Sequence, residues 1–379
     1  MIKYPSRLLL SLSGCLIPLL LDSLFGSLPS LAAKTIVLRY GLLEQSLPVA
    51  DLRRYAETQQ VSSELQSFLS YLKPKEKQMF QGVLQVKKFL DIGAFSKLVN
   101  TQIGEQFLNV YSPTIARRDQ AGIPALKSAL VLGATSPEGL GIISFLEAYP
   151  SNRIVIDLAK TSKLLRMPKL PAGSTNPPPK DNLTASPLWQ LELQYQTFAT
   201  QDKKFSGCLF GDSISAGLGN SLGEGTFNFA FNGVSTISLV EQLQRLIPTN
   251  AKCQKTVIAI GGNDAWYGMS DELFVQKLQE AIALVRATGT KEIFLIPAFY
   301  STVAASLDPN KAAPLSRVEK INALITQVAA TEKVTVAAEG VAPLYENNVL
   351  KENLTSDGHH LNAEGLNIYR AALLKLLGS

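Results

Sequence analysis

The sequence predicts an α/β domain with a parallel sheet in the second half of the chain and a mainly α-helical domain in front of it. After residue 204, short runs rich in Val and Ile alternate with amphipathic helical patterns. Repeated strand–helix units of this length are typical of a parallel sheet with helices on both faces. Residues 34–166 instead contain helical patterns separated by short breaks. The 379 residues, 46% of them hydrophobic, are enough for two globular domains.

Composition and charge exclude several classes of partner. The formal net charge is +5, but Lys and Arg are scattered and form no run of five or more. No nucleic-acid partner is therefore expected. The whole chain has 2 histidines, which leaves little for a His-rich metal site, so we expect neither a metal nor a cofactor.

Residues 1–33 are typical of a secretory signal peptide, so we expect export to the periplasm or the medium. Lys3 and Arg7 precede an apolar run over residues 8–21, and a small-x-small cleavage site follows. That run is shorter than the ~20 apolar residues that span a bilayer, although an uncleaved anchor stays an alternative. Lipidation of Cys15 is a second alternative, since Leu-Ser-Gly-Cys resembles a lipoprotein cleavage site.

The front domain carries two helix-start signals and two strand patterns. Ser63 stands three residues before Gln66, as in a capping box, and the Ser-Pro-Glu triplet from Ser136 gives a second start. The runs Thr35–Arg39 and Arg153–Asp157 predict two short strands that pair. We find no set of nucleophile and base in this domain, which contains no histidine.

A proline-rich linker is predicted over residues 167–187, where six prolines mix with Gly, Ser, Thr and Asn. The second domain then covers residues 188–379. Just after the linker, Trp189 to Gln196 alternate apolar and polar side chains, a pattern that predicts a half-buried edge strand.

The second domain is expected to contain five strands and four long helices. The predicted strands lie at 205–210, 226–231, 256–260, 292–296 and 334–338, and the predicted helices at 236–247, 271–287, 315–330 and 362–377. In parallel sheets, functional residues gather where the strands end at their carboxyl edge. The polar residues that follow these strands are therefore the candidates for a site.

Four polar motifs stand out: three follow successive predicted strands, and the fourth precedes the last predicted helix. They are Gly-Asp-Ser213, Asn-Gly233, Gly-Gly-Asn263-Asp and Asp357-Gly-His-His360. A serine is a weak nucleophile until a base such as histidine takes its proton, and a carboxylate holds that histidine in one tautomer. Backbone N–H groups of Ser213 and Gly233 and the amide of Asn263 are suitable donors to an oxyanion. The motifs together predict a site for acyl transfer.

This combination resembles the SGNH hydrolases, also called the GDSL esterase/lipase family, over about residues 204–379. The resemblance implies a flavodoxin-like, three-layer α/β/α fold, in agreement with the strand–helix pattern. It implies that Ser213 is the nucleophile and also an oxyanion donor. It further assigns Gly233 and Asn263 to the oxyanion hole, and Asp357 and His360 to the Asp-x-x-His motif of the catalytic triad.

Two residues depart from the family pattern, and other assignments stay open. Ile214 replaces the usual leucine, and His359 stands where the family often has a hydrophobic residue, so we interpret it as a packing or rim residue. Asp264 is expected to make structural hydrogen bonds. Trp266 and Tyr267 either line the substrate pocket or pack in the interior. A substrate-shaping loop is predicted from Phe299 to Pro314.

The front region, from about Ala33 to Arg166, resembles a bacterial domain family of unknown function found ahead of hydrolase domains. The matching runs are Ile36–Gly41, Tyr55–Glu57, Val61–Leu65, Ile103–Glu105 and Ile154–Asp157. This resemblance implies no activity. We expect either a docking or lid-like helical module, or a module that binds a cell-envelope partner.

The two remaining cysteines are expected to be free thiols. Cys208 lies three residues before Gly211, and Cys253 eight before Gly261, and those glycines are predicted to end neighbouring strands. The five-residue offset corresponds to about 16 Å along a strand. A disulfide tolerates only about 7 Å between Cα atoms.

The leading hypothesis is an exported serine esterase that acts through an acyl-enzyme on envelope glycans or lipids. Its partner would be an ester substrate, whether a small molecule, a lipid or an acylated glycan, with contact to the envelope or membrane surface. Acyl transfer to a sugar is a variant of the same chemistry. The alternative is a non-enzymatic envelope-binding protein in which the helical domain supplies the function.

Overall fold

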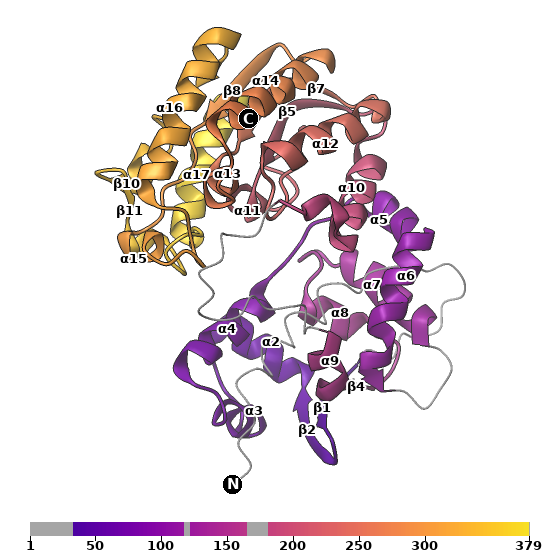
Figure 1. Cartoon of the computed structure of the whole chain (residues 1–379). Coiled ribbons are helices and arrows are strands. Elements are labelled where there is room, and N and C mark those ends of the chain that lie inside the picture. Colours follow the sequence, from indigo (N-terminus) through magenta and orange to yellow (C-terminus); the bar gives the residue numbers. More distant parts are fainter. Residues whose placement is uncertain (1–32, 117–121, 165–180, 379) are drawn as a thin grey trace. The chain divides into compact units, whose positions relative to one another are not determined.

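The computed structural model describes residues 33–116, 122–164 and 181–378. The chain forms two compact units, which divide between Ser174 and Thr175. Figure 1 labels the elements of each unit. Nearly all of the predicted signal segment and most of the predicted linker lie outside the described residues.

The front unit contains a four-stranded sheet of order β2-β1-β4-β3. β1 (Thr35–Tyr40) pairs antiparallel with β2 (Leu43–Pro48) and parallel with β4 (Arg153–Asp157). β3 (Ile115–Ala116) adds a short antiparallel edge to β4. The prediction that the first and last of these strand patterns pair is therefore confirmed. Alternate residues of β1 and β4 belong to one apolar core.

Helices pack around this core, so the front unit is mainly helical, as predicted. They are α2 (Val49–Thr58), α3 (Ser63–Leu69), α4 (Pro74–Gln85), α5 (Ile92–Val99), α6 (Gln102–Tyr111), η1 (Ser112–Thr114), α7 (Gly122–Ala134), α8 (Ile142–Ala148) and α9 (Leu158–Leu164). In the described part of the chain, no helix is both long enough and apolar enough to cross a bilayer.

Of the two predicted helix starts, the first is displaced by one residue and the second is wrong. The cap of α3 is Ser62 rather than Ser63, and its hydroxyl accepts a backbone N–H from the first turn. Ser136 lies in a turn, where its carbonyl accepts from the N–H of Gly139 at 2.8 Å. Gly139 has a φ of +75°, which interrupts a helical path, so α8 begins only at Ile142.

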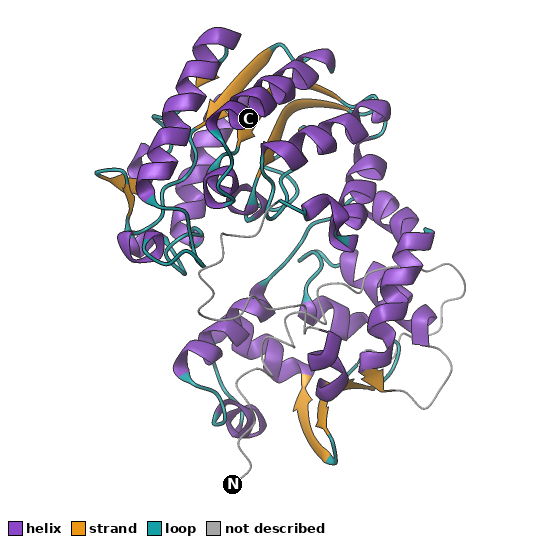
Figure 2. Cartoon of the chain, in the orientation of Figure 1, coloured by secondary structure: helices purple, strands orange, loops and turns teal. Residues whose placement is uncertain are grey.

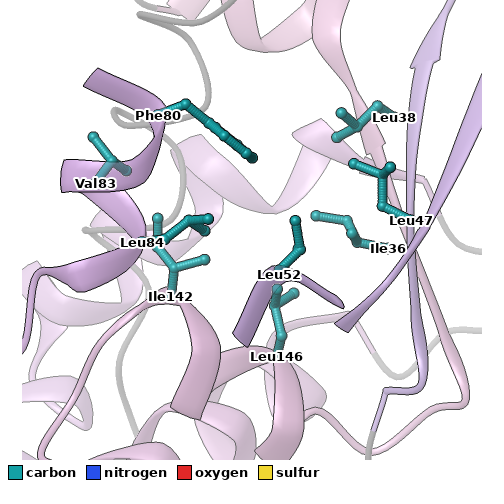
Figure 3. Close-up of a pocket in the computed structure, with 9 residues that line it drawn as sticks. All are labelled: Ile36, Leu38, Leu47, Leu52, Phe80, Val83, Leu84, Ile142 and Leu146. Carbon is teal, nitrogen blue, oxygen red and sulfur yellow. The ribbon is translucent and has the colours of Figure 1, made fainter. Parts of the chain in front are cut away.

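A small apolar cavity lies in the core of the front unit (Figure 3). Figure 3 shows Phe80 and Leu84 of α4 on one side and Leu38 and Leu47 of the strands on the other. All nine lining residues are apolar. A cavity of this kind has no polar group to orient a reacting ester, so its lining indicates packing rather than chemistry.

The second unit is built on a five-stranded, wholly parallel sheet of order β6-β5-β7-β8-β9, which confirms the predicted fold class. β6 and β9 are shorter than predicted, whereas β8 has the predicted bounds. The strands are β5 (Lys204–Gly211), β6 (Thr226–Asn228), β7 (Lys252–Ala259), β8 (Glu292–Ile296) and β9 (Thr335–Val336), with a separate hairpin of β10 (Tyr345–Glu346) and β11 (Val349–Leu350).

Helices cover both faces of this sheet (Figure 2). They are α10 (Pro187–Thr200), α11 (Ser213–Ala216), α12 (Thr236–Leu246), α13 (Gly262–Trp266), α14 (Asp271–Ala287), α15 (Val303–Ser306), α16 (Leu315–Glu332) and α17 (Ala363–Leu377), with the short turns η2 (Leu183–Ala185), η3 (Ile247–Thr249), η4 (Ala342–Leu344) and η5 (Glu352–Leu354). The chain moves from β5 to β6 in one direction and from β6 through β7, β8 and β9 in the other. Right-handed crossovers then place α11 on one face and α12, α14 and α16 on the opposite face. α17 shares a core with Leu209 and Val257, which completes three layers.

The predicted edge strand after the linker is wrong, because this segment forms α10. Ser186 occupies the N-cap position and Pro187 is the first helical residue, a common helix start. Trp189, Leu193 and Gln196 are buried, at intervals of three and four residues. The apolar–polar alternation over this stretch is therefore accidental. The Ser-Pro helix start indicates the correct structure.

The prediction of free thiols is also wrong, because Cys208 and Cys253 form a disulfide with Cα atoms 5.8 Å apart. The prediction assumed that Gly211 lies level with Gly261, but the register places Gly211 beside Ala259. The offset along the strands is thus three residues instead of five. Three residues of a regular strand rise about 10 Å. The two Cα atoms lie 5.8 Å apart, so the pair is closer than a regular strand with this register would place it.

Candidate active site at the carboxyl edge of the parallel sheet

Ser213 stands just beyond the carboxyl end of β5, as the first residue of α11. Asp212 caps this helix, since its Oδ1 accepts the N–H of Ile214 at 3.1 Å. Gly211 is required at the end of the strand, because a Cβ there would lie 2.3 Å from Ser215 Oγ. The sharp turn from strand to helix therefore fixes the half-buried Ser213 at the edge of the sheet.

His360 lies between Ser213 and Asp357. Its Nε2 is 3.0 Å from Ser213 Oγ, and its Nδ1 is 2.8 Å from Asp357 Oδ2. The other oxygen of Asp357 accepts the backbone N–H of His359 at 2.9 Å and of His360 at 2.8 Å. This chain of hydrogen bonds allows the imidazole to take a proton from the hydroxyl while the carboxylate holds the ring. Three of the five predicted site residues are thus in direct contact.

The Asp357 carboxylate is held in its charged form. Partial burial raises its pKa, but the hydrogen bonds from the His360 ring and from two backbone N–H groups outweigh burial and lower the pKa to about 2. Asp357 therefore stays ionised at any pH at which a serine esterase would work. An ionised Asp357 keeps the Nδ1 proton on His360 and leaves Nε2 free to act as a base.

Gly233 lies in a tight turn after β6, in which Val234 N–H donates to Phe231 O at 3.4 Å. Its φ of +84° favours glycine at this point of the turn. The hydroxyl of Tyr267 donates to the carbonyl oxygen of Gly233 at 3.0 Å, so a side chain from the next motif holds the turn. Tyr267 is half-buried and its hydroxyl lies beside this turn. That Tyr267 or Trp266 lines the substrate pocket stays a prediction.

Asn263 is buried in α13, at the carboxyl end of β7. Its Nδ2 donates to Val234 O at 3.0 Å, which places it beside the turn that carries Gly233. An amide nitrogen has two hydrogens, so this bond orients the side chain and leaves a second donor. The same loop approaches the nucleophile motif, because a Cβ on Gly262 would lie 3.4 Å from Asp212 Oδ2.

Asp264 makes structural hydrogen bonds, as predicted. Its Oδ1 accepts from Thr236 N at 2.9 Å and from Thr236 Oγ1 at 2.6 Å, which ties the start of α12 to the end of β7. Burial raises the pKa of Asp264 to about 6 and that of Asp212 to about 6 as well. A buried carboxyl thus stands next to each of Ser213 and Asn263 in the chain.

The ring of His359 packs against that of His360, and only its backbone N–H donates to Asp357. Its ring lies edge-on to that of His360, with centroids 4.8 Å apart. Burial lowers the pKa of His359 to about 4, so this ring is neutral at physiological pH. These observations agree with its interpretation as a packing residue.

The predicted loop over residues 299–314 supports two of the motifs. Thr302 N donates to Gly358 O at 2.8 Å, next to Asp357. Trp266 Nε1 donates to Pro309 O at 2.7 Å. The loop therefore packs beside the reacting residues, and its effect on substrate choice stays a prediction.

Sequence reasoning missed the residues that come directly before α10. Asp181 Oδ2 accepts a hydrogen bond from Ser235 Oγ, at the start of α12. Leu183 lies near Gly233, because a Cβ placed on Gly233 would be 4.0 Å from Leu183 Cδ1. Both fall within the segment predicted as a linker. The available signal was Asp181 two residues before Leu183, an Asx-turn pattern that is weak by itself.

Two family models match the chain. Residues 32–157 match a family described as an alpha/beta hydrolase of unknown function (DUF1400). Residues 209–368 match the GDSL-like Lipase/Acylhydrolase family, and that range includes all five predicted site residues. A search of curated proteins finds no match.

Several solved structures are similar to the second unit. They include a GDSL-like lipase from Bacteroides thetaiotaomicron (16% identity, 47% of this chain, 88% of that chain, TM-score 0.40). An acetylxylan esterase from Geobacillus stearothermophilus (16% identity, 47% and 94%, TM-score 0.37) and a lipase/acylhydrolase from Enterococcus faecalis (20% identity, 46% and 96%, TM-score 0.36) are further examples. At these TM-scores the assignment rests on the family model and not on the structures. Residues 209–368 thus match the GDSL-like lipase/acylhydrolase family, and this match supports a serine hydrolase with esterase function.

Proposed function

We propose that the protein is an exported serine esterase in which Ser213 is the nucleophile, His360 the general base and Asp357 the residue that orients it. One observation carries this proposal. His360 is within hydrogen-bond distance of both partners, 3.0 Å from Ser213 Oγ and 2.8 Å from Asp357 Oδ2. A histidine in a merely structural role has no need of a serine on one nitrogen and a carboxylate on the other.

The first half of the reaction forms an acyl-enzyme. Ser213 Oγ attacks the ester carbonyl carbon while His360 Nε2 takes the hydroxyl proton. The carbonyl oxygen becomes an oxyanion, which accepts hydrogen bonds from Ser213 N–H, Gly233 N–H and Asn263 Nδ2. When the C–O bond to the alcohol breaks, the alcohol leaves with the proton from His360, and the acyl group stays on Ser213.

The second half releases the acid. Water attacks the acyl carbon and gives a proton to His360, and the second tetrahedral intermediate collapses with return of that proton to Ser213 Oγ. The products are the carboxylic acid and free enzyme. A sugar hydroxyl in place of water would transfer the acyl group instead, and the two outcomes separate when an added alcohol competes with water for the acyl-enzyme.

Export is supported by the disulfide and by the pattern of residues 1–33. Cys208 and Cys253 are buried and joined in the described structure. Disulfides persist in oxidising compartments and are rare where thiols are kept reduced. Together with the signal-like segment, this favours the periplasm or the medium, where acylated envelope glycans and lipids are the available esters.

The test is the intact mass of the full-length expressed protein after exposure to a fluorophosphonate, beside the Ser213→Ala variant. We expect a single adduct on the wild type and none on the variant, because only an activated serine displaces fluoride. Absence of the adduct on a folded wild type would favour the alternative, an envelope-binding protein without catalysis. The N-terminal residue of protein secreted from an expression host tests the export proposal separately.

A further inference from the structure

The hairpin of β1 and β2 in the front unit ends in an exposed apolar tip, residues 40–43, which we call the hairpin tip. The strands pair as far as Tyr40 and Leu43, so Gly41 and Leu42 alone form the turn. Gly41 has a φ of +62°, as suits the first central position of a tight hairpin turn. Leu42 is 103% exposed, and Tyr40 and Leu43 are 38% and 37% exposed. In Figure 2 this hairpin extends beyond the helices of the front unit.

The hairpin has one apolar face and one charged face. Tyr40 lies four residues after the core residue Ile36 and therefore on the same face of β1, and it pairs directly with Leu43. Arg39 pairs with Glu44 on the opposite face. The apolar face thus continues past the end of the core, where the structure leaves it exposed.

Cations outnumber carboxylates around the base of the hairpin tip. Glu44 Oε1 is 2.6 Å from Arg39 and its Oε2 is 2.5 Å from Arg153. Asp157 lies level with Arg39 on β4, and the backbone N–H of Lys160 donates to its carboxylate at 3.0 Å. Three cations and two carboxylates leave one net positive charge beside the apolar side chains. A positive balance favours an anionic surface.

The size and chemistry of the hairpin tip favour a lipid surface over a protein. A stable protein interface buries about 800 Å² on each partner, which three side chains cannot supply. The turn projects about two residues, or roughly 7 Å, beyond the Arg39–Glu44 pair. Interfacial segments enter a bilayer by about 5–10 Å, with tyrosine at the headgroups. Arginine is suited to the lipid phosphates.

We propose that the hairpin tip docks the front unit onto an anionic lipid surface, with Leu42 among the acyl chains and Arg39 and Arg153 near the phosphates. The fold does not require a leucine at this point, since small polar residues are the usual occupants of tight turns. This inference goes beyond the proposed esterase function and does not depend on Ser213. It gives the front unit a role of its own, which is to hold the protein at a membrane.

The experiment measures partition of the full chain onto vesicles of equal parts phosphatidylcholine and phosphatidylglycerol, by co-sedimentation. We expect Leu42→Ser to lower the partition coefficient at least about 10-fold, because burial of one leucine is lost while the turn is kept. The control is Val110→Ser, since Val110 is an aliphatic residue of α6 in the same unit and is 51% exposed. This control should partition like the wild type.

The charged face is tested with Arg153→Gln. Loss of one cation near the surface should weaken binding to the mixed vesicles about 5-fold and leave binding to pure phosphatidylcholine vesicles unchanged. Equal effects on both kinds of vesicle would overturn the assignment of an anionic surface.

Three outcomes with Leu42→Ser would overturn the docking site. They are partition equal to that of the wild type, an equal loss in Val110→Ser, and a change of oligomeric state without vesicles, which would assign the hairpin tip to a second copy of the chain. The fluorophosphonate adduct on Ser213 is expected in all of these variants. Its absence from the wild type would remove the proposed esterase function and leave the docking site standing.

A second measurement covers the case in which residues 1–33 bind vesicles by themselves. Leu42→Trp places a fluorophore at the hairpin tip, and lipids brominated on their acyl chains quench tryptophan inside the bilayer. We expect more quenching than in the wild type, whose own tryptophans are Trp189 and Trp266, and no excess in the control Val110→Trp. Quenching of Leu42→Trp no greater than that of the wild type would contradict insertion of the hairpin tip.

Discussion

Two aspartates, one in each unit, make the same contacts with the backbone. Asp157 Oδ1 accepts the N–H groups two and three residues further on, at 3.1 and 3.0 Å. Asp357 Oδ1 does the same at 2.9 and 2.8 Å. The difference lies in the second oxygen of Asp357, which holds His360 Nδ1. The turn is thus a common structural element, and the chemistry comes from what the other oxygen faces.

The two units also differ in the polar groups that they bury. The buried polar side chains described in the front unit are the hydroxyl residues Thr114, Ser144 and Thr161. The second unit buries carboxyl and amide groups as well, among them Asp212 and Asp264. Burying a carboxyl costs free energy unless it is hydrogen-bonded or protonated. Such a cost is expected beside a functional site and not in a core that only packs.

Replacing each aspartate by asparagine should give the largest contrast between the units. Asparagine keeps an acceptor for the backbone N–H groups, but its NH₂ cannot accept the proton on His360 Nδ1. We expect Asp357→Asn to lower kcat by about 10²- to 10⁴-fold, because the imidazole adopts the wrong tautomer. Asp157→Asn should leave kcat within about twofold, since its turn is kept. Equal losses in the two variants would show that the turn and not the tautomer matters.

Removal of the disulfide should destabilise one unit selectively. The Cys208→Ala/Cys253→Ala double variant loses a cross-link over a sequence separation of 45 residues, and we expect the second unit to lose about 2–4 kcal/mol of unfolding free energy. Front-unit unfolding should not change. Calorimetry of wild type and double variant measures both, with reduced wild type as the control. An unchanged transition for the second unit would contradict this prediction.

The buried Asp264 should give the second unit a pH dependence of its own. Its pKa rises from 3.8 to about 6 on folding, so the folded unit binds this proton more tightly than the unfolded chain does. Protonated Asp264 therefore contributes fully to the free energy of unfolding below pH 3.8, and this contribution is lost as the pH rises through 6. The upper limit is about 3 kcal/mol, from 1.36 kcal/mol per unit of pKa. Asp264→Asn keeps an acceptor for Thr236 and should flatten the decline in stability between pH 4 and pH 7, as measured by chemical denaturation. If the stability of Asp264→Asn declines as steeply as that of the wild type, groups other than Asp264 cause the decline.

The smallest change in stability is expected when Arg53 is removed from an ion-pair network on the front unit. Arg53 contacts Glu147 at 2.6 Å and Glu138 at 2.7 Å, and hydrogen bonds to these carboxylates raise its pKa. Because the partners are partly exposed, we expect Arg53→Ala to cost about 1 kcal/mol of front-unit stability without changing kcat. The neighbouring Arg54→Ala is the control, since Arg54 is 3.8 Å from its partner and mostly exposed. A loss of activity in Arg53→Ala would connect the front unit to catalysis.

The sequence was most informative where local signals agreed with the fold. α14 spans Asp271–Ala287 as predicted, because Ser270 caps it and two acidic residues occupy its first turn. The segment after the linker carries two conflicting signals, an alternating pattern over Trp189 to Gln196 and a Ser-Pro helix start. The alternation predicts a strand, which is wrong, because the segment is a helix. Local patterns decide an element only when they do not compete.

Prediction of the candidate site also succeeded for some residues and failed for others. Ser213 could be predicted because it follows a strand at the carboxyl edge of the sheet. Asp357 and His360 could be predicted from their three-residue spacing and from the resemblance to the Asp-x-x-His motif. The disulfide could not, because it depends on a register two residues away from the one that aligns Gly211 with Gly261. Leu183 could not be predicted either, since nothing in a proline-rich stretch indicates that its last residues fold back toward Gly233.

The disulfide between Cys208 and Cys253 also affects how often the strands that carry the site open. It joins two adjacent inner strands, β5 and β7, whose carboxyl ends lead directly to Ser213 and to Asn263. Inner strands that are buried and cross-linked open only with the global unfolding of their unit. The backbone amides of β5 and β7 should therefore be the slowest in their unit to exchange with deuterium. Slow opening there would keep nucleophile and oxyanion donor in register while the loops around them fluctuate.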